Sequence, residues 1–497
     1  MSKSSIELAI KDFSKGLNLD DAENVCDLSY NVNCYNFDFK SGALVEGVGI
    51  ERLTLPKTRE YGSSEAKIKD IASDVEVKNV WHFKHYTSSA KKREDKLMYR
   101  LSDNTVYTTE LITSLPIPLQ INDLLLNDDV TAINFKDDNM DTILMCTDED
   151  GCYTYSAESP FEKHENMPII KDLCVHKDKV FVLESFDKTN IRYSNNLNIL
   201  EMKKELSDGE GKISLTDNIG EVQKLISQYG HLFAVRDYGI TKITTYANSD
   251  NFNISNIYAS GTKIYEKTVC SCGDTIIMLT RNGLYEFNAN SCEKINTKLN
   301  DFLNKINNDK AIACFRAGNY YISCRIDFKD GKKIGCENED NYVNNVFICY
   351  NVIDKTYSIC RGIDITNLLS LQIESCDKVI ATFGSKYQKT LGQVCDSGSF
   401  FDEINERYWC SPLSDLGYSD KTKYVKYLSL LSNYDCNVTV FTEKLSKTFK
   451  VRGKSVLTKL PVNIRGKQIG IKITTNEAKA YISNLKLSID LTDNLYD

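Results

Sequence analysis

The chain has 497 residues, so it can bury a large core and exceeds the usual size of one compact domain. Its 41% hydrophobic and 26% charged content is typical of globular proteins and excludes wholesale disorder. The net charge of −8 excludes a general nucleic-acid coat, which would be basic. No apolar run is long enough for a membrane span, and the first residues lack the apolar core of a signal peptide, so we expect neither.

The cysteine and aromatic content indicates further what kind of fold and redox state to expect. The 17 cysteines are spread from Cys26 to Cys436 without paired spacing, and their number is odd. Without a secretory leader, we expect them to be reduced and mostly buried as small apolar residues. The 28 Tyr and 20 Phe beside only 7 Pro favour many half-buried strands, because aromatic rings pack well across a pleated sheet.

In chain order, residues 1–60 are expected to form an N-terminal arm and the first strands. From about Val77 to residue 412, one unit recurs: an alternating apolar run, a short polar turn, and a second run ending in aromatics. We count about six or seven copies at a spacing of roughly 40 to 50 residues, which is typical of four-stranded propeller blades. The turns between runs contain residues that tolerate positive φ: Ser102-Asp103-Asn104, Glu149-Asp150-Gly151, Tyr229-Gly230, Tyr238-Gly239, Cys272-Gly273-Asp274 and Asn282-Gly283.

These repeats predict an all-β fold with a β-propeller over residues 75–412. A run of β-sandwiches would produce similar strands and is the alternative. One helix is expected, over residues 298–309, because Leu299, Phe302, Leu303 and Ile306 follow helical spacing. It lies between two copies and is interpreted as a packed insertion.

The C-terminal segment, residues 421–497, differs from the repeats. After a polar linker, Ile469, Ile471 and Ile473 alternate with polar residues, and Leu485 to Leu491 repeat the pattern. Strict alternation indicates strands with one buried face. The segment is expected to form a small C-terminal β-sandwich-like region, or the closing strands of a terminal blade.

Basic residues are concentrated in this last segment. Between Lys421 and Lys472 there are twelve Lys and Arg but only two acidic residues, so this stretch carries about +10 and the rest of the chain about −18. Lysines on the wet faces of strands would explain this, and so would a docking surface for an acidic partner or nucleic acid. The candidate docking residues are Lys444, Lys447, Lys450, Arg452 and Lys454.

Motifs for chemistry are absent from the sequence: there is no phosphate-binding glycine loop, no nucleophile elbow and no zinc-protease motif. His82 and His85 are three apart in a predicted strand and therefore on opposite faces, which is a poor metal pair. Cys270 and Cys272 share a face but lack further ligands. We therefore expect no catalytic residue, no metal and no cofactor.

The two ends of the chain carry a resemblance. Near the N-terminus stand Phe13-x-Lys15-Gly16-Leu17-Asn18, Leu28, Asn33-x-x-Asn36-Phe37-Asp38-Phe39-x-x-Gly42-Ala43-Leu44 and Gly49. Near the C-terminus stand strands around Val438–Phe441 and Leu460–Ile473, followed by Ala480-Tyr-Ile-Ser-Asn-Leu485. These patterns resemble the opening and ending of tailed-bacteriophage virion proteins that carry propellers, namely packaged-DNA stabilisation proteins and tail nozzles. Lys15 replaces the first glycine of that pattern, and no arginine precedes Gly49.

The resemblance implies a structural virion protein, made in the bacterial host cytoplasm and located in the phage tail or neck. Such proteins form rings, often six-fold, that contact portal-adaptor and tail proteins, retain the genome and conduct DNA without sequence specificity during ejection. The alternatives are a carbohydrate-binding adhesin propeller for host attachment and a hydrolase on a propeller scaffold.

Overall fold

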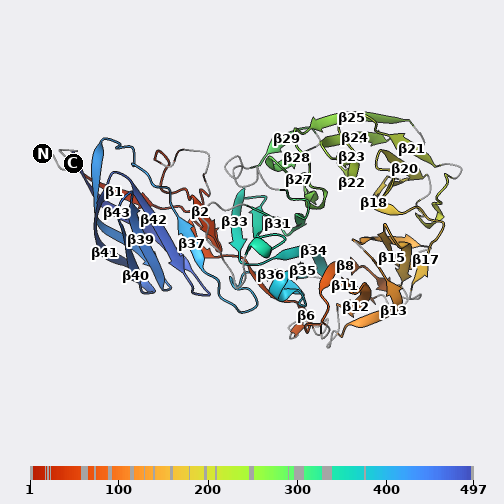
Figure 1. Cartoon of the computed structure of the whole chain (residues 1–497), viewed down its shortest axis with the longest axis horizontal. Helices are drawn as coiled ribbons and strands as arrows, with labels where there is room; N and C mark the ends of the chain where they lie inside the picture. The colour runs from red at the N-terminus through yellow and green to blue at the C-terminus, as the bar shows by residue number, and fades with distance from the viewer. Residues whose placement is uncertain are drawn as a thin grey trace.

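Short antiparallel sheets make up most of the computed structural model (Figure 1). The structure describes residues 4–16, 18, 22, 24–56, 65–71, 74–87, 92–93, 95–111, 117–127, 129–137, 140–156, 161–177, 179–194, 197, 199–206, 210–245, 251–288, 290–295, 307–326, 339–373 and 376–493. The helix expected over 298–309 lies almost wholly outside these residues. No helix in the described ranges has the length and apolar character that a membrane crossing requires.

Seven four-stranded antiparallel sheets form the blades of a β-propeller within the described residues (Figure 1). The first four blades are β8 (Val77–Phe83), β11 (Lys96–Leu101), β12 (Thr105–Glu110) and β13 (Leu119–Leu125); β14 (Thr131–Asp137), β15 (Met140–Thr147), β16 (Gly151–Ser156) and β17 (Glu162–Lys163); β18 (Ile170–His176), β19 (Lys179–Glu184), β20 (Asn190–Ser194) and β21 (Gly211–Ser214); β22 (Val222–Gln228), β23 (His231–Arg236), β24 (Gly239–Thr245) and β25 (Phe252–Ala259).

The remaining three blades are β26 (Cys270–Cys272), β27 (Thr275–Thr280), β28 (Gly283–Phe287) and β29 (Cys292–Lys294); β30 (Ile312–Arg316), β31 (Asn319–Cys324), β32 (Val346–Asn351) and β33 (Thr356–Arg361); β34 (Ile365–Ile373), β35 (Cys376–Phe383), β36 (Gly392–Cys395) and β5 (Gly49–Arg52). Two small two-stranded ribbons accompany the blades: β6 (Thr54–Pro56) with β7 (Glu65–Lys67), and β9 (Tyr86–Thr87) with β10 (Lys92–Arg93). There are also short 3₁₀ helices in the described residues: η1 (Ile199–Glu201), η2 (Glu266–Thr268), η4 (Glu339–Asn341) and η5 (Ser385–Tyr387). The predicted propeller is therefore confirmed.

Blade strands are apolar on both faces because each face packs on a neighbouring blade. In β23, Leu232 and Ala234 pack with the blade before it, whereas Phe233 and Val235 pack with the blade after it. Successive side chains of a strand point to opposite faces, so a continuous apolar run is needed here. The turn from β22 to β23 has Tyr229 and Gly230 at φ values of 55° and 72°, as the hairpin signal in the sequence predicted.

The ring of blades closes with a strand from the N-terminal part of the chain. β5 pairs antiparallel with β36 as the outer strand of the seventh blade, where Ile50 lies opposite Val394. Ile50 is fully buried in the core of that blade. The inner strands β34 and β8 lie side by side, so the last blade also meets the first. The N-terminal residues thus hold the ring together.

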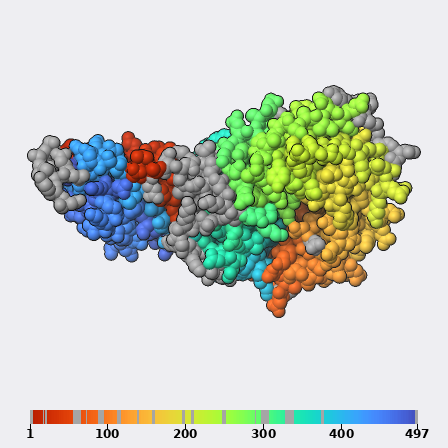
Figure 2. Space-filling model, turned by 45° about the horizontal axis from the view of Figure 1, so that its top comes forward, coloured from red at the N-terminus to blue at the C-terminus, as the bar shows by residue number. Residues whose placement is uncertain are grey.

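A two-sheet β-sandwich lies beside the propeller, at the left of Figure 1 and in blue in Figure 2. Its larger sheet contains β3 (Phe37–Lys40), β4 (Ala43–Glu46), β43 (Tyr481–Asp493), β38 (Lys421–Ser432) and β41 (Lys454–Gly466), with β1 (Ser4–Ile10) also paired to β43. The other sheet contains β2 (Asn33–Tyr35), β37 (Arg407–Cys410), β42 (Ile469–Thr475), β39 (Cys436–Thr442) and β40 (Ser446–Val451).

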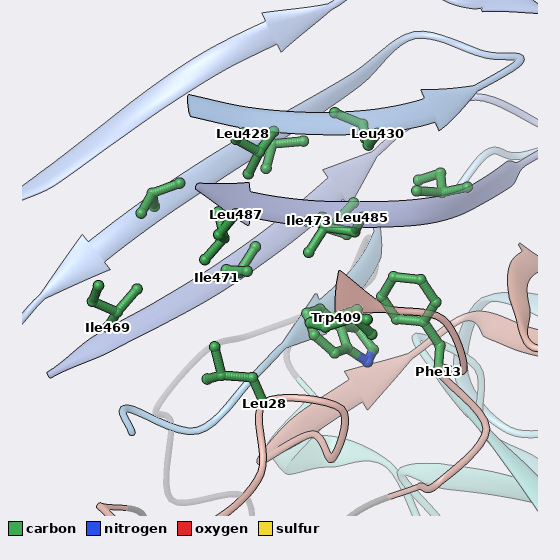
Figure 3. Packing of buried hydrophobic residues seen from close by; sticks show 14 of the residues in the cluster. Phe13, Leu28, Trp409, Leu428, Leu430, Ile469, Ile471, Ile473, Leu485 and Leu487 are labelled. Atoms are coloured by element: carbon green, nitrogen blue, oxygen red, sulfur yellow. The ribbon is translucent and has the colours of Figure 1, made fainter. Parts of the chain in front are cut away.

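The sandwich differs from the expected 421–497 unit because strands from both ends of the chain build it. Phe13 and Trp409 meet edge to face, with ring centroids 5.0 Å apart, and both are fully buried (Figure 3). They share one core with Leu428 and Leu487 of the larger sheet and Ile471 of the other. The N-terminal arm expected over 1–60 is accordingly divided between the sandwich and the seventh blade, and β37 lies in the sandwich although the expected propeller range reaches residue 412.

Contacts around Tyr35 join the sandwich to the propeller. Tyr35 stacks on Tyr408 with centroids 5.0 Å apart, and the Arg361 guanidinium lies 5.0 Å from the centre of its ring. The Asn36 backbone N–H donates to the Ile359 carbonyl at 2.8 Å, and the Arg361 backbone N–H donates to Asn36 Oδ1 at 3.0 Å. The Arg361 side chain is paired with buried Glu339 at 2.8 Å. Aromatic stacking and buried hydrogen bonds therefore fix this junction.

Candidate docking edge of the sandwich

The five candidate docking residues lie on and between β40 and β41, the outer strands of the two sandwich sheets. Lys447 and Lys450 belong to β40, Arg452 lies between the strands, Lys454 begins β41, and Lys444 precedes β40. All five are exposed. Because β40 and β41 each end their sheet, both present an unpaired strand edge, and we call this region the basic edge.

The two acidic residues of this stretch, Asp435 and Glu443, accept hydrogen bonds from backbone N–H groups of its turns. Glu443 accepts backbone hydrogen bonds from Lys467 at 2.9 Å and Gln468 at 3.0 Å. Burial raises the pKa of Glu443. The backbone N–H groups and nearby Lys444 together lower it by more than burial raises it, so the net shift is downward. Asp435 accepts the Gly453 backbone N–H at 2.8 Å.

The positive charge of the basic edge is therefore not neutralised by acidic side chains of the same stretch. None of the five basic residues forms an ion pair with an acidic side chain in the described part of the chain. A cluster of like charges without partners attracts an acidic surface and speeds association with it.

Lys447 plays a different part from the other four. In the register of β39 and β40 it lies opposite buried Val440, so it is on the inner face of the sheet. Its Nζ donates to the backbone carbonyls of Val462 at 2.9 Å and Asn463 at 3.0 Å on β41. Lys447 thus joins the two sheets at their open side, and an inward charge on an edge strand also discourages unwanted strand pairing.

Exposed apolar side chains accompany the charges, which the sequence reasoning did not foresee. Leu445, Val456 and Leu457 are 59%, 62% and 55% exposed. Of these three, Leu445 lines a cavity of about 670 Å³, together with Lys447, Tyr424 and residues of β41 and β43. Val456 and Leu457 are adjacent, so they break the alternation of apolar and polar residues in β41. This break is the sequence signal that could have predicted an exposed apolar surface here. Apolar residues with a charged rim are typical of protein interaction surfaces.

A second cavity, of about 690 Å³, opens at one end of the propeller ring. Its lining residues come from the first and second strands of several blades and the loops around them, so spacing along the sequence could not reveal it. Lys171 pairs there with Glu266 at 2.8 Å, and Lys267 pairs with Asp129. Burial raises the pKa of Asp172 in the same wall. These ion pairs cross between blades and bind the mouth of the ring together.

The residues weighed for chemistry do not assemble a site. No three His, Cys, Asp or Glu side chains in the described ranges are placed to hold a metal ion. Buried His82 lies 3.1 Å from Asp95, and the His85 backbone N–H donates to the same carboxylate at 3.0 Å. This arrangement anchors the loop that follows β8. Fifteen cysteines of the described residues are free thiols.

Seven blades and a two-sheet sandwich define this chain as a β-propeller protein with an attached β-sandwich. No family model matches the chain, and no curated protein matches it in sequence. Among solved structures, the computationally designed protein Ika8 matches 65% of this chain and 98% of its own, at 10% identity and a TM-score of 0.35. Hsv2 of Kluyveromyces lactis matches 60% of this chain and 87% of its own, at 9% identity and a TM-score of 0.34. The fold assignment stands on the sheet topology itself.

Proposed function

We propose that this chain is a structural protein of a tailed-phage virion, in which it forms part of the tail or neck ring that retains and conducts DNA. The observation that carries the proposal is the basic edge: exposed cations without an acidic partner in the described residues, on and between two open strand edges, together with exposed Val456 and Leu457. A surface of this kind suits stable docking to an acidic neighbour in an assembly.

The arrangement of the chain ends supports the same proposal. The two segments that resemble phage tail proteins lie far apart in sequence, yet they share one core: Phe13, Phe37 and Leu44 pack with Ile482 and Leu485. The sandwich is thus one unit made of both segments. In the proposed assembly this unit docks to the next tail or portal-adaptor protein, and the propeller extends away from it.

The charge balance outside the basic stretch suits contact with DNA that must slide. That part of the chain carries about −18. A protein surface that neutralises few phosphates releases few counterions and therefore holds DNA weakly. We propose that copies of the acidic propeller line a passage through which DNA moves without sequence-specific binding. The role assigns no catalytic step and no cofactor to the chain.

Charge reversal at the basic edge tests the proposal. We expect K444E/K450E/R452E/K454E to abolish incorporation into tails of the parent particle, because four reversed charges repel the acidic neighbour. Lys447 is left unchanged because it joins the two sheets. Incorporation is measured by electron microscopy and protein content of purified particles, and circular dichroism of the isolated chain verifies its fold.

The matched control reverses four exposed lysines of the propeller side, Lys69, Lys84, Lys163 and Lys203. It changes the net charge by the same amount, so normal incorporation of this control shows that position matters. Normal particles from the basic-edge variant would overturn docking by this edge. Absence of the wild-type chain from the particles would overturn the virion role.

A carbohydrate-binding adhesin is the second candidate, favoured by exposed aromatics on blade turns. Phe186 is 78% exposed after β19, and Tyr238 is 45% exposed after β23, in consecutive blades. Exposed rings are suited to stacking on sugars. Binding of the purified chain to a glycan array, lost in F186A/Y238A, would favour this candidate over the first.

A further inference from the structure

Two cysteines of the second blade lie directly opposite each other. Cys146 near the end of β15 pairs in register with Cys152 near the start of β16. Their Sγ atoms are 2.7 Å apart, and both side chains are almost fully buried. The turn between them is closed at Gly151, which has a φ of 91°. The hairpin therefore holds two thiols together without any movement of the backbone.

The surroundings make the two thiols unequal. The hydrogen bond from Cys146 is the main cause that lowers the pKa of Cys152. Burial raises this pKa by less, and the Ile170 backbone and Lys204 add smaller contributions that lower it, so the net shift is downward. Burial is the main cause that raises the pKa of Cys146. Cys152 Sγ also donates to the Pro168 carbonyl at 3.2 Å in its thiol form. Cys152 is thus the better nucleophile of the pair, and Cys146 the residue that holds its proton.

Cys146 also lines the cavity of about 690 Å³ at the mouth of the ring, so the pair lies just behind the cavity wall. A water-sized reagent that enters this cavity reaches the wall that carries the hairpin. Larger disulfide reagents have no comparable route to side chains this deeply buried.

We propose that Cys146 and Cys152 form a redox site that a hydroperoxide converts into a cross-strand disulfide. This is a modification site of the propeller and does not depend on the proposed virion role.

The reaction balances in two steps. The Cys152 thiolate attacks one oxygen of hydrogen peroxide, the O–O bond breaks, and hydroxide leaves to become water, which gives a sulfenic acid at Cys152. Cys146 then loses its proton and attacks Cys152 Sγ, the S–O bond breaks, and a second water forms. The two thiols lose two electrons in total, and the peroxide is reduced to two waters.

The cross-link would act on the mouth of the ring through the turn between the cysteines. Asp150 in that turn accepts hydrogen bonds from the Asn127 backbone N–H at 2.6 Å and the Asn127 Nδ2 at 2.8 Å. The same loop carries Asp129, which pairs with Lys267 across the cavity. A disulfide fixes the hairpin that positions this loop, so oxidation is expected to reduce opening at this side of the ring.

Peptide mapping of the whole folded chain tests the site. Trypsin leaves Cys146 and Cys152 in one peptide, residues 137–163, because no Lys or Arg interrupts it. After brief treatment with hydrogen peroxide and alkylation in denaturant, we expect this peptide to lose two hydrogens and to resist alkylation. Total free thiols should fall from 17 toward 15. Cleavage at Asp148 should then leave the two halves joined until reductant is added.

Single variants separate the roles of the thiols. In C146S, the sulfenic acid on Cys152 is expected to persist and to react with a dimedone probe, whereas C152S should show little labelling at Cys146. C174S, which alters a half-buried cysteine of the next blade, should leave the cross-link intact. An unmodified wild-type peptide 137–163 under conditions that oxidise exposed Met140 to the sulfoxide would overturn the proposal, and so would cross-links spread evenly over other cysteines.

Discussion

The propeller and the sandwich are both all-β, but they are assembled from the chain in opposite ways. Six blades are each built from one continuous stretch of the chain, so most of their strand pairs are local. In the sandwich, β1 pairs with β43, and Ser4 lies opposite Leu491. Local pairs form at a small loop-closure cost, whereas pairing the two ends of a chain requires most of the molecule to be ordered first.

The comparison shows that one short segment serves both regions. Residues before Leu53 supply β1 to β4 of the sandwich and β5 of the seventh blade. The ring and the sandwich therefore depend on the same N-terminal segment, although the rest of each lies elsewhere in the chain.

The largest expected effect comes from deletion of residues 1–52. It removes buried Phe13, Tyr35, Phe37 and Ile50. Loss of one large buried aromatic costs about 3–5 kcal/mol, and a whole domain has a stability of only about 5–15 kcal/mol. We expect the truncated chain to lose cooperative unfolding in thermal denaturation followed by circular dichroism.

The point variant F13A gives the graded comparison. It should cost about 3–5 kcal/mol and weaken amide protection in the sandwich, while β5 and the seventh blade stay protected in hydrogen exchange. A truncated chain that melts as sharply and at the same temperature as the full chain would contradict the shared role of this segment.

A smaller effect is expected at the junction between the two regions. Arg361 and Glu339 are buried, and Arg361 also lies over Tyr35 of the sandwich. Arg361→Met should cost about 3–5 kcal/mol, because it leaves the Glu339 carboxylate buried without its partner. Urea denaturation measures this cost. The double variant R361M/E339L should recover part of it, and an equal or larger loss in the double variant would argue against an unpaired charge as the cause.

The smallest effect concerns Glu443 at the basic edge. Its pKa in the folded chain lies below the ordinary value of 4.5, so its ionised form stabilises the fold. That contribution is complete above about pH 5 and is lost as the pH falls through the folded pKa. Glu443→Gln should cost about 1 kcal/mol at pH 7, since the carboxylate is partly exposed.

Denaturation midpoints of wild type and E443Q between pH 7 and pH 3 measure this dependence. The difference between the two should shrink below pH 4.5. Glu477→Gln serves as the control, because it removes one exposed carboxylate from the turn after β42. A difference that grows toward low pH would show that the sign is wrong.

The blades could be predicted because their signals are local. The turns at Ser102–Asn104, Tyr229–Gly230 and Asn282–Gly283 are hairpins in the structure, as residues that tolerate positive φ indicated. Candidate docking residues were proposed from charge alone, and the structure places Lys444, Lys450, Arg452 and Lys454 beside and on β40 and at the start of β41. Val456 and Leu457 were missed although their adjacency breaks the alternation of β41, and Leu445 was missed because it precedes β40 and follows no alternation.

The sequence by itself determined which residues form strands, where hairpins turn, and that positive charge is gathered near the C-terminus. Alternation of apolar residues specifies which face of a strand is buried, but every strand offers the same backbone groups at its edges. Only the tertiary structure therefore decided that β5 completes the last blade, that Trp409 packs on Phe13, and that Lys447 points inward to join two sheets. The first two choices depend on packing between segments more than 300 residues apart, whereas Lys447 contacts a strand 15 residues further along the chain.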